Sequence, residues 1–214
     1  MMHFFRRDFL FFTLGLLSLG LFGWLVRRTM RKPSVPADGE PADDFVLPVN
    51  ANQMPVLRLN DFVFRVDRQR KTVCAYHTET GELVWESHGK EHFIVPGAAF
   101  PIDLSATGEL WVANVGRKRL EQLDPKSGAY IAFWEPNQVF GGCCNPVRFA
   151  ALSGGRFVTM EKGTRRACVY LPSGELEAVI SDNLTDSEFN YYLRRDGETV
   201  DLYDIGIRHH WKVV

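Results

Sequence analysis

Three kinds of turn recur along this 214-residue chain at intervals of about 47 residues. The first has Ser or Thr before a glycine, the second a glycine before a charged residue, and the third a polar residue two positions before a glycine. The glycines concerned are Gly81, Gly128 and Gly174 in the first set, Gly108, Gly155 and Gly197 in the second, and Gly116, Gly163 and Gly206 in the third. Because three independent sets share one interval, the sequence predicts structural repeats of about 45 residues.

Between these turns, apolar and polar residues alternate as they do in half-buried β-strands. No segment after residue 45 keeps a helical period over ten residues. Four short strands in a repeat of about 45 residues are typical of a β-propeller blade. We therefore predict an all-β fold, a small β-propeller of about four blades preceded by one transmembrane helix. The predicted units are about 45–87, 88–135, 136–181 and 182–214.

The alternation also predicts strands and core residues. The second repeat is expected to have strands at 101–106, 110–115, 119–124 and 129–135, and the fourth at 189–194, 199–204 and 208–213. Residues expected to pack between blades are Phe62, Phe64, Leu110, Val112, Phe157, Val158 and Tyr203, and core tryptophans are expected at Trp85, Trp111 and Trp134.

The N-terminal region differs in composition from the repeats. Residues 9–26 are apolar apart from Gly, Ser and Thr, and a helix over them would be about 27 Å long, close to the thickness of a bilayer core. We expect residues 1–32 to form a signal-anchor or transmembrane segment. Residues 33–44, rich in Pro and acids, are expected to form a tether.

Two patterns in the N-terminal region predict opposite orientations. Basic residues are more numerous after the apolar segment than before it, which favours a cytoplasmic body. In contrast, Arg6, Arg7, Phe9 and Leu10 resemble the core of a bacterial twin-arginine export signal. We expect a retained, single-pass inner-membrane anchor with the repeats on the periplasmic side.

The repeats themselves resemble known families. Residues 74–85, which end in Thr-Gly and a Trp four residues later, are similar to a quinoprotein-type repeat, as are residues 123–128. Residues 140–174 resemble bacterial NHL-repeat propeller proteins. The resemblance implies the fold, but hardly any function, because such propellers serve as scaffolds, binders and enzymes. Four blades leave no room for a large central quinone, so a PQQ cofactor is not expected.

The fourth repeat ends after three strands, and this suggests how the ring closes. Residues 45–49 have the composition of a strand and precede the first repeat. We predict that they pair antiparallel with about 208–213 as the outer strand of the fourth blade, which would remove an exposed edge.

The four cysteines fall into two groups. Cys74 and Cys168 occupy matching positions in third strands and are expected to be buried there. Cys143 and Cys144 are adjacent in a loop, expected on the same propeller face as Glu161 and Arg165. They form either a packed loop, a labile vicinal disulfide or a soft-metal site. Such a site would take copper, with His92 as a third ligand.

Long connections between blades, at about 88–100, 136–145 and 181–188, share this face and indicate a binding surface. The third turn set would add a ring of paired charges there, unless its residues serve only turn chemistry. The candidate binding-face residues are Cys143, Cys144, His92, Asn114, Glu161, Arg165, Asp204 and Arg208, with Lys118 as a further partner.

Charge and motifs exclude several functions. Residues 33–214 carry a net charge of about −6, which argues against nucleic acid as a partner. The chain has no nucleotide-binding fingerprint and no zincin or serine-hydrolase motif. We expect a membrane-anchored extracytoplasmic propeller that binds a protein partner, as a scaffold or accessory subunit of a membrane redox or respiratory complex. A metal- or thiol-redox module using Cys143 and Cys144 is the alternative, and a propeller hydrolase the second alternative.

Overall fold

The computed structural model describes residues 56–142, 144–184, 191–196, 199–204 and 207–212. In these ranges the chain is all-β, with one three-residue 3₁₀ helix at Ser153–Gly155. No described helix is long or apolar enough to span a membrane. The predicted anchor at 9–26 and the segment 45–49 lie outside the described residues.

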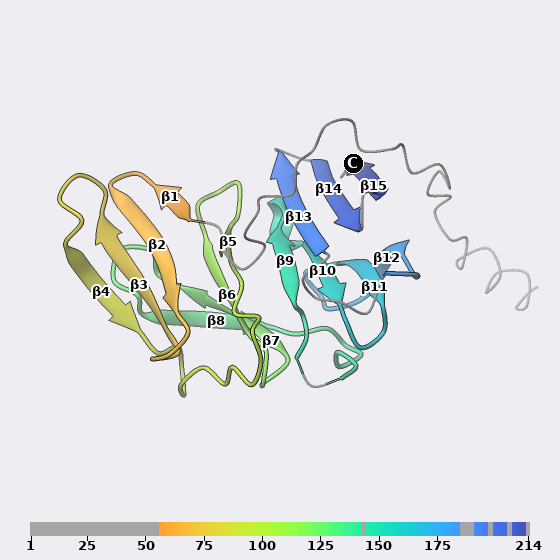
Figure 1. Ribbon diagram of the computed structural model, residues 1–214, viewed down its shortest axis with the longest axis horizontal. Helices are drawn as coiled ribbons and strands as arrows, with labels where there is room; N and C mark the ends of the chain where they lie inside the picture. The colour runs from red at the N-terminus through yellow and green to blue at the C-terminus, as the bar shows by residue number, and fades with distance from the viewer. Residues whose placement is uncertain (1–55, 143, 185–190, 197–198, 205–206, 213–214) are drawn as a thin grey trace, which may run out of the picture. The chain divides into compact units, whose positions relative to one another are not determined.

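The strands form four antiparallel sheets, each with its strands in chain order (Figure 1). Sheet 1 contains β1 (Leu57–Leu59), β2 (Phe62–Asp67), β3 (Thr72–His77) and β4 (Leu83–Ser87). Sheet 2 contains β5 (Ile102–Leu104), β6 (Leu110–Asn114), β7 (Arg119–Leu123) and β8 (Tyr130–Trp134).

Sheets 3 and 4 follow the same plan. Sheet 3 contains β9 (Arg148–Ala151), β10 (Phe157–Glu161), β11 (Arg166–Tyr170) and β12 (Leu176–Ser181). Sheet 4 contains β13 (Tyr191–Asp196), β14 (Thr199–Asp204) and β15 (Ile207–Lys212). The strands predicted for the second and fourth repeats are confirmed, with every bound within two residues.

Left-handed backbone explains why the turns repeat. Gly81, Gly128 and Gly174, between the third and fourth strands of sheets 1 to 3, have φ of 71°, 72° and 84°. Glycine adopts such angles without the steric penalty that a Cβ brings. Another side chain at Gly128 would also collide with the ring of Trp85, since a Cβ would lie 2.5 Å from it.

Successive side chains along a central strand point to opposite faces of its sheet, so one strand contributes to the interfaces with both neighbouring sheets. On β6, Leu110 and Val112 belong to a buried cluster shared with sheet 1, whereas Trp111 and Ala113 belong to one shared with sheet 3. On β10, Phe157 lies in the cluster shared with sheet 2.

The third cluster joins sheets 3 and 4 and contains Val158 from β10 with Val200 and Leu202 from β14. The first strands of the four sheets contact one another in chain order, β1 to β5, β5 to β9 and β9 to β13. Phe64, Leu110, Val112, Phe157 and Val158 therefore pack between sheets as expected, and Phe62 is half-buried against the cluster of sheets 1 and 2. Tyr203, Trp85, Trp111 and Trp134 are buried.

The indole N–H groups of two of these tryptophans link neighbouring sheets. Nε1 of Trp85, on β4, donates a hydrogen bond to the carbonyl of Pro125 (3.1 Å), in the β7–β8 turn. Nε1 of Trp134, on β8, donates to the carbonyl of Leu171 (3.2 Å), in the β11–β12 turn. Each outer strand is thereby fixed to the next sheet.

Candidate binding face

The loop between β4 and β5 folds over the β6–β7 turn of sheet 2. The N–H of Gly116 donates to the carbonyl of Ile94 (2.8 Å), and the N–H of Ile94 donates to Oδ1 of Asn114 (3.0 Å). A Cβ at Gly116 would lie 2.3 Å from the Ile94 side chain, so the loop and the turn are in tight contact.

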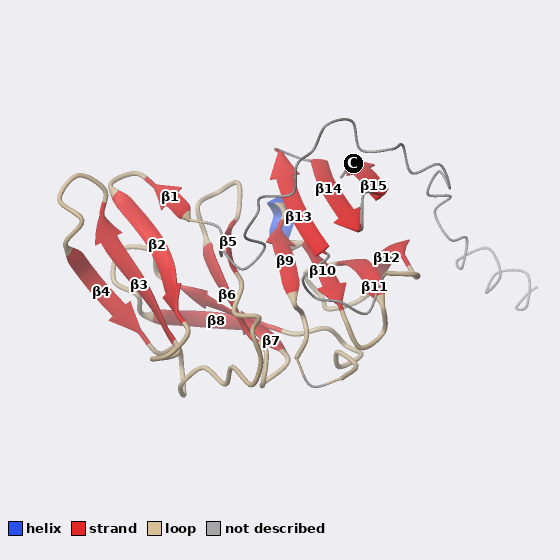
Figure 2. Ribbon diagram, viewed as in Figure 1, coloured by secondary structure: helices blue, strands red, loops and turns tan. Residues whose placement is uncertain are grey.

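The loop between β8 and β9 covers the β10–β11 turn of sheet 3 in the same way. The N–H of Lys162 donates to Oδ1 of Asn145 (2.8 Å), and Nδ2 of Asn145 donates to the carbonyl of Gly141. The β8–β9 loop and the β10–β11 turn therefore lie on one side of sheet 3, while the position of Cys143 beside Glu161 stays a prediction. Figure 2 draws the described residues of both loops in tan.

The two loops also meet each other. A Cβ at Gly97, in the first loop, would lie 3.4 Å from Sγ of Cys144, in the second. Cys144 is half-buried there, and Cys143 lies outside the described residues. We call the surface formed by residues 88–98, 136–142 and 144–145 the loop face.

His92, the third ligand expected for a copper site, is exposed on the loop face. Its ring centroid lies 5.1 Å from that of His88, edge to face. Within the described ranges, no three His, Cys, Asp or Glu residues are grouped so that they could hold a metal ion. The copper alternative, which requires Cys143, stays a prediction.

Asn114 belongs to a buried network around Glu121, a residue that the sequence analysis did not single out. Oε1 of Glu121 accepts hydrogen bonds from Nδ2 of Asn114 (2.9 Å) and from Nε (2.9 Å) and Nη2 (2.7 Å) of Arg119. Oε2 accepts one from the N–H of Lys90 (3.1 Å). Since Asn114 and Glu121 are both fully buried, they hold the first loop rather than face solvent.

Glu161 is the counterpart of Asn114 in sheet 3 and is also buried. Its Oε1 accepts hydrogen bonds from Oη of Tyr170 (2.6 Å) and Oγ1 of Thr159 (3.2 Å). Its Oε2 accepts one from Oγ1 of Thr164 (2.9 Å), and Nη2 of Arg166 lies 3.3 Å away as its ion-pair partner. This buried carboxylate therefore binds side chains of sheet 3 and of its β10–β11 turn and does not face solvent.

Of the two readings of the third turn set, turn chemistry fits the basic residues that the structure describes. Nε of Arg165 donates to the carbonyl of Leu184 (2.6 Å), and the ion-pair partner of Glu161 is Arg166. Lys118 and Arg165, with Lys71 at the matching place in sheet 1, have φ of 57°, 54° and 56°. They are the left-handed residues of their hairpin turns. For Asp204 and Arg208 only the backbone, in β14 and β15, is described.

Both single cysteines are buried in third strands, Cys74 in β3 and Cys168 in β11, as expected. Burial and the neighbouring Glu161 carboxylate raise the pKa of the Cys168 thiol to about 12. Burial and the hydrogen bond to Glu161 also raise the pKa of Tyr170. Both groups stay protonated at neutral pH, so Cys168 is no thiolate nucleophile.

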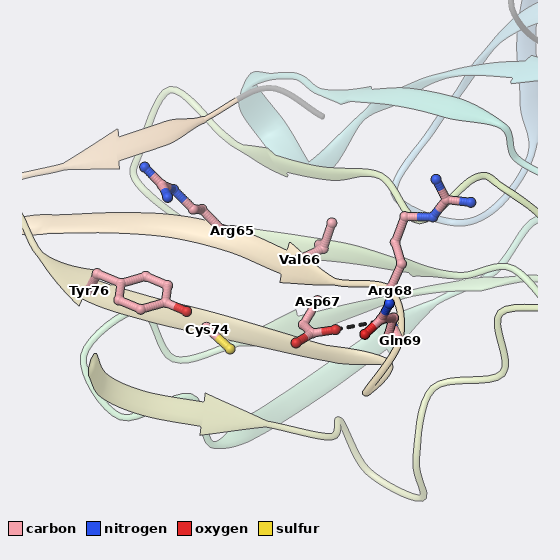
Figure 3. Close-up of a pocket in the computed structure, with 7 residues that line it drawn as sticks. All are labelled: Arg65, Val66, Asp67, Arg68, Gln69, Cys74 and Tyr76. Atoms are coloured by element: carbon pink, nitrogen blue, oxygen red, sulfur yellow. Dashed lines mark hydrogen bonds between the residues drawn. The ribbon is translucent and has the colours of Figure 1, made fainter. Parts of the chain in front are cut away.

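A hollow of about 310 Å³ lies on sheet 1, and the sequence analysis missed it (Figure 3). Phe64, Val73 and Ala75 face sheet 2, so the alternate residues of β2 and β3 face the other way. The guanidinium of Arg65 lies 5.9 Å from the ring centroid of Tyr76 there. The hollow is lined by Arg65, Val66, Asp67, Arg68, Gln69, Cys74 and Tyr76.

Neither a protein-family model nor a curated protein sequence matches the chain. Among solved structures, catalytically inactive virginiamycin B lyase from Staphylococcus aureus with quinupristin is similar, with a TM-score of 0.51 and 14% identity. The match covers 72% of this chain and 49% of the lyase chain. The chain has a β-propeller fold.

Two further propellers are similar at lower scores. Hydrazine synthase of Kuenenia stuttgartiensis has a TM-score of 0.44 and 14% identity, over 71% of this chain and 46% of that one. BamB from Moraxella catarrhalis has a TM-score of 0.40 and 13% identity, over 74% and 48%. This propeller chain thus spans about half the length of the structures it matches.

Proposed function

We propose that this protein is a membrane-anchored, extracytoplasmic β-propeller that binds a protein partner through its loop face. It would act as a scaffold or accessory subunit of a membrane redox or respiratory complex. The anchor is residues 9–26, and the twin-arginine-like residues Arg6 and Arg7 support export to the periplasmic side. The NHL- and quinoprotein-like repeats are compatible with a binding role.

The observation that carries the proposal is a pair of exposed apolar side chains on firmly held loops. Ile94 is 45% exposed and Val139 is 65% exposed. Each is next to a buried phenylalanine, Phe93 or Phe140, that fixes its loop to the core. Apolar side chains presented on a rigid base suit a protein partner, because little conformational entropy is lost when they are covered.

The binding role is tested by changing the loop face alone. We expect the double substitution Ile94→Glu with Val139→Glu to reduce recovery of a crosslinked partner from native membranes by about tenfold or more, which corresponds to about 1.4 kcal/mol. The control is Leu176→Glu on outer strand β12, where the leucine is 46% exposed. Equal recovery with both variants, or a protein that runs as a lone monomer in mild detergent, would contradict the proposal.

The periplasmic location is tested separately by fusions after Val214. Alkaline phosphatase becomes active only where its disulfides form, outside the cytoplasm. We expect an active phosphatase fusion and a dark green-fluorescent-protein fusion. The reverse pattern would place the propeller in the cytoplasm and remove the export part of the proposal.

A further inference from the structure

The hollow on sheet 1 lies where, in sheets 2 and 3, a side chain from the connecting loop packs against the third strand. At the repeat interval of 47 residues, Cys74 corresponds to Glu121 and Cys168, and Tyr76 corresponds to Tyr170. In sheets 2 and 3 these residues face the preceding sheet, across an interface that the connecting loop helps to close. On sheet 1 the same positions line the hollow.

A buried phenylalanine from the connecting loop covers this position in both later sheets. Phe140 and Phe93 are each 2% exposed. The ring of Phe140 lies 6.1 Å from that of Tyr170, edge to face. A Cβ at Gly89 would lie 2.8 Å from the ring of Phe93 and 2.5 Å from Oε2 of Glu121, so that ring adjoins the counterpart of Cys74.

The register of the sheets predicts where a third such residue would lie. Leu104 pairs with Leu110, and Phe93 lies eleven residues before Leu104. Ala151 pairs with Phe157, and Phe140 lies eleven residues before Ala151. We call Leu104 and Ala151, the first-strand partners of Leu110 and Phe157, the reference residues of their sheets.

In sheet 1 the counterpart of Leu110 and Phe157 is Val63, which pairs with Arg58. Eleven residues before Arg58 is Leu47, in the middle of the apolar segment 45–49.

We propose that Leu47 packs into the hollow against Tyr76 and Cys74, as Phe93 and Phe140 pack in sheets 2 and 3. Segment 45–49 is then the connecting loop that belongs to sheet 1, and it attaches the N-terminal region to the propeller. The hollow accepts it because Tyr76 and Cys74 offer apolar surface, while Arg65, Asp67 and Arg68 also line the hollow (Figure 3). The proposal concerns the propeller body alone and does not depend on the proposed function.

This assignment differs from pairing of 45–49 with 208–213 as an outer strand. Strands β4 and β8 end at Ser87 and Trp134, each seventeen residues before its reference residue. In sheet 1 the reference residue is Arg58, and seventeen residues before it is residue 41. By this count an outer strand would end near residue 41, and residues 45–49 would belong to the loop that follows such a strand. The two arrangements are separated by experiment.

Alanine substitutions in the full chain test which side chain is buried. The neighbours Val139 and His92, which precede the two buried phenylalanines, are exposed. Val46 is therefore the matched control for Leu47. We expect Leu47→Ala to lower Tm by about 5 °C or more and Val46→Ala to change it by about 1 °C or less. Equal changes in the two variants would overturn the proposal.

Crosslinking tests the location directly. Under mild oxidation of the full chain, we expect Leu47→Cys to form an intramolecular disulfide with the native Cys74, identified by peptide mass spectrometry, and Val46→Cys to form none. The chemistry requires Cα atoms within about 7 Å. A crosslink from position 47 to a His210→Cys substitution, or a disulfide between two chains, would overturn the proposal in favour of the outer-strand pairing or of a second copy.

Discussion

Replacing Phe157 by alanine is expected to lower the free energy of unfolding by about 3–5 kcal/mol. The side chain is 1% exposed and lies between two tryptophans from sheet 2. Its ring centroid is 4.8 Å from that of Trp111 and 4.7 Å from that of Trp134. The substitution leaves a cavity at the interface of two sheets and removes both aromatic contacts.

Urea unfolding followed by tryptophan fluorescence measures this loss, since Trp111 and Trp134 adjoin the site. The matched control is Ile131→Ala on β8, where the side chain is 53% exposed and the expected change is below about 0.5 kcal/mol. A loss below about 1 kcal/mol for Phe157→Ala would mean that the ring is not packed between sheets 2 and 3.

The fold was predictable from the sequence because each repeat carries the same local constraints. Glycines such as Gly81 and Gly128 are required by their left-handed angles, so their spacing reports the spacing of the turns. All five residues of β6 and of β10 are buried because each strand has a neighbouring sheet on both faces, and successive side chains fill the two interfaces in turn. Turn spacing and alternation together determine the strands and the core.

The roles of the charged residues could not be predicted in the same way. Position alone does not show whether a hairpin-end carboxylate such as Glu161 faces solvent or the next sheet. Its burial depends on the connecting loop above it and on Tyr170, nine residues later, which donates to it. The sequence leaves open whether Lys118 and Arg165 pair with such groups or serve turn chemistry, and their left-handed φ angles favour turn chemistry.

The 47-residue interval between matching positions indicates the roles of these residues better than the pattern of charges does. Lys71, Lys118 and Arg165 are spaced by 47 residues, and this spacing signals a shared backbone conformation. The same interval relates Cys74 to Glu121 and Cys168, which shows that one position can hold a thiol or a carboxylate. A carboxylate is accommodated in sheet 2 because Arg119, Asn114 and the N–H of Lys90 surround it.

Because the Glu121 carboxylate depends on these partners, a substitution at Arg119 is also expected to have a large effect on stability. We expect Arg119→Met to lower the free energy of unfolding by about 3–5 kcal/mol, because it leaves the Glu121 carboxylate buried without its cationic partner. Nη2 of Arg119 lies 2.7 Å from Oε1 of Glu121, whose side chain is fully buried. Methionine keeps the apolar stem, so the loss reports the missing guanidinium.

Two comparison variants separate the ion pair from other contacts of Arg119. The guanidinium also lies 4.8 Å from the ring centroid of Phe133, and Phe133→Leu is expected to cost about 1 kcal/mol or less if that contact is minor. The double variant Arg119→Met with Glu121→Met removes the stranded charge and is expected to be more stable than Arg119→Met alone. It should not regain full stability, because Nδ2 of Asn114 and the N–H of Lys90 lose their acceptor. If the double variant is the less stable of the two, the buried carboxylate is not the source of the loss, and the polar network does not hold the β4–β5 loop as described.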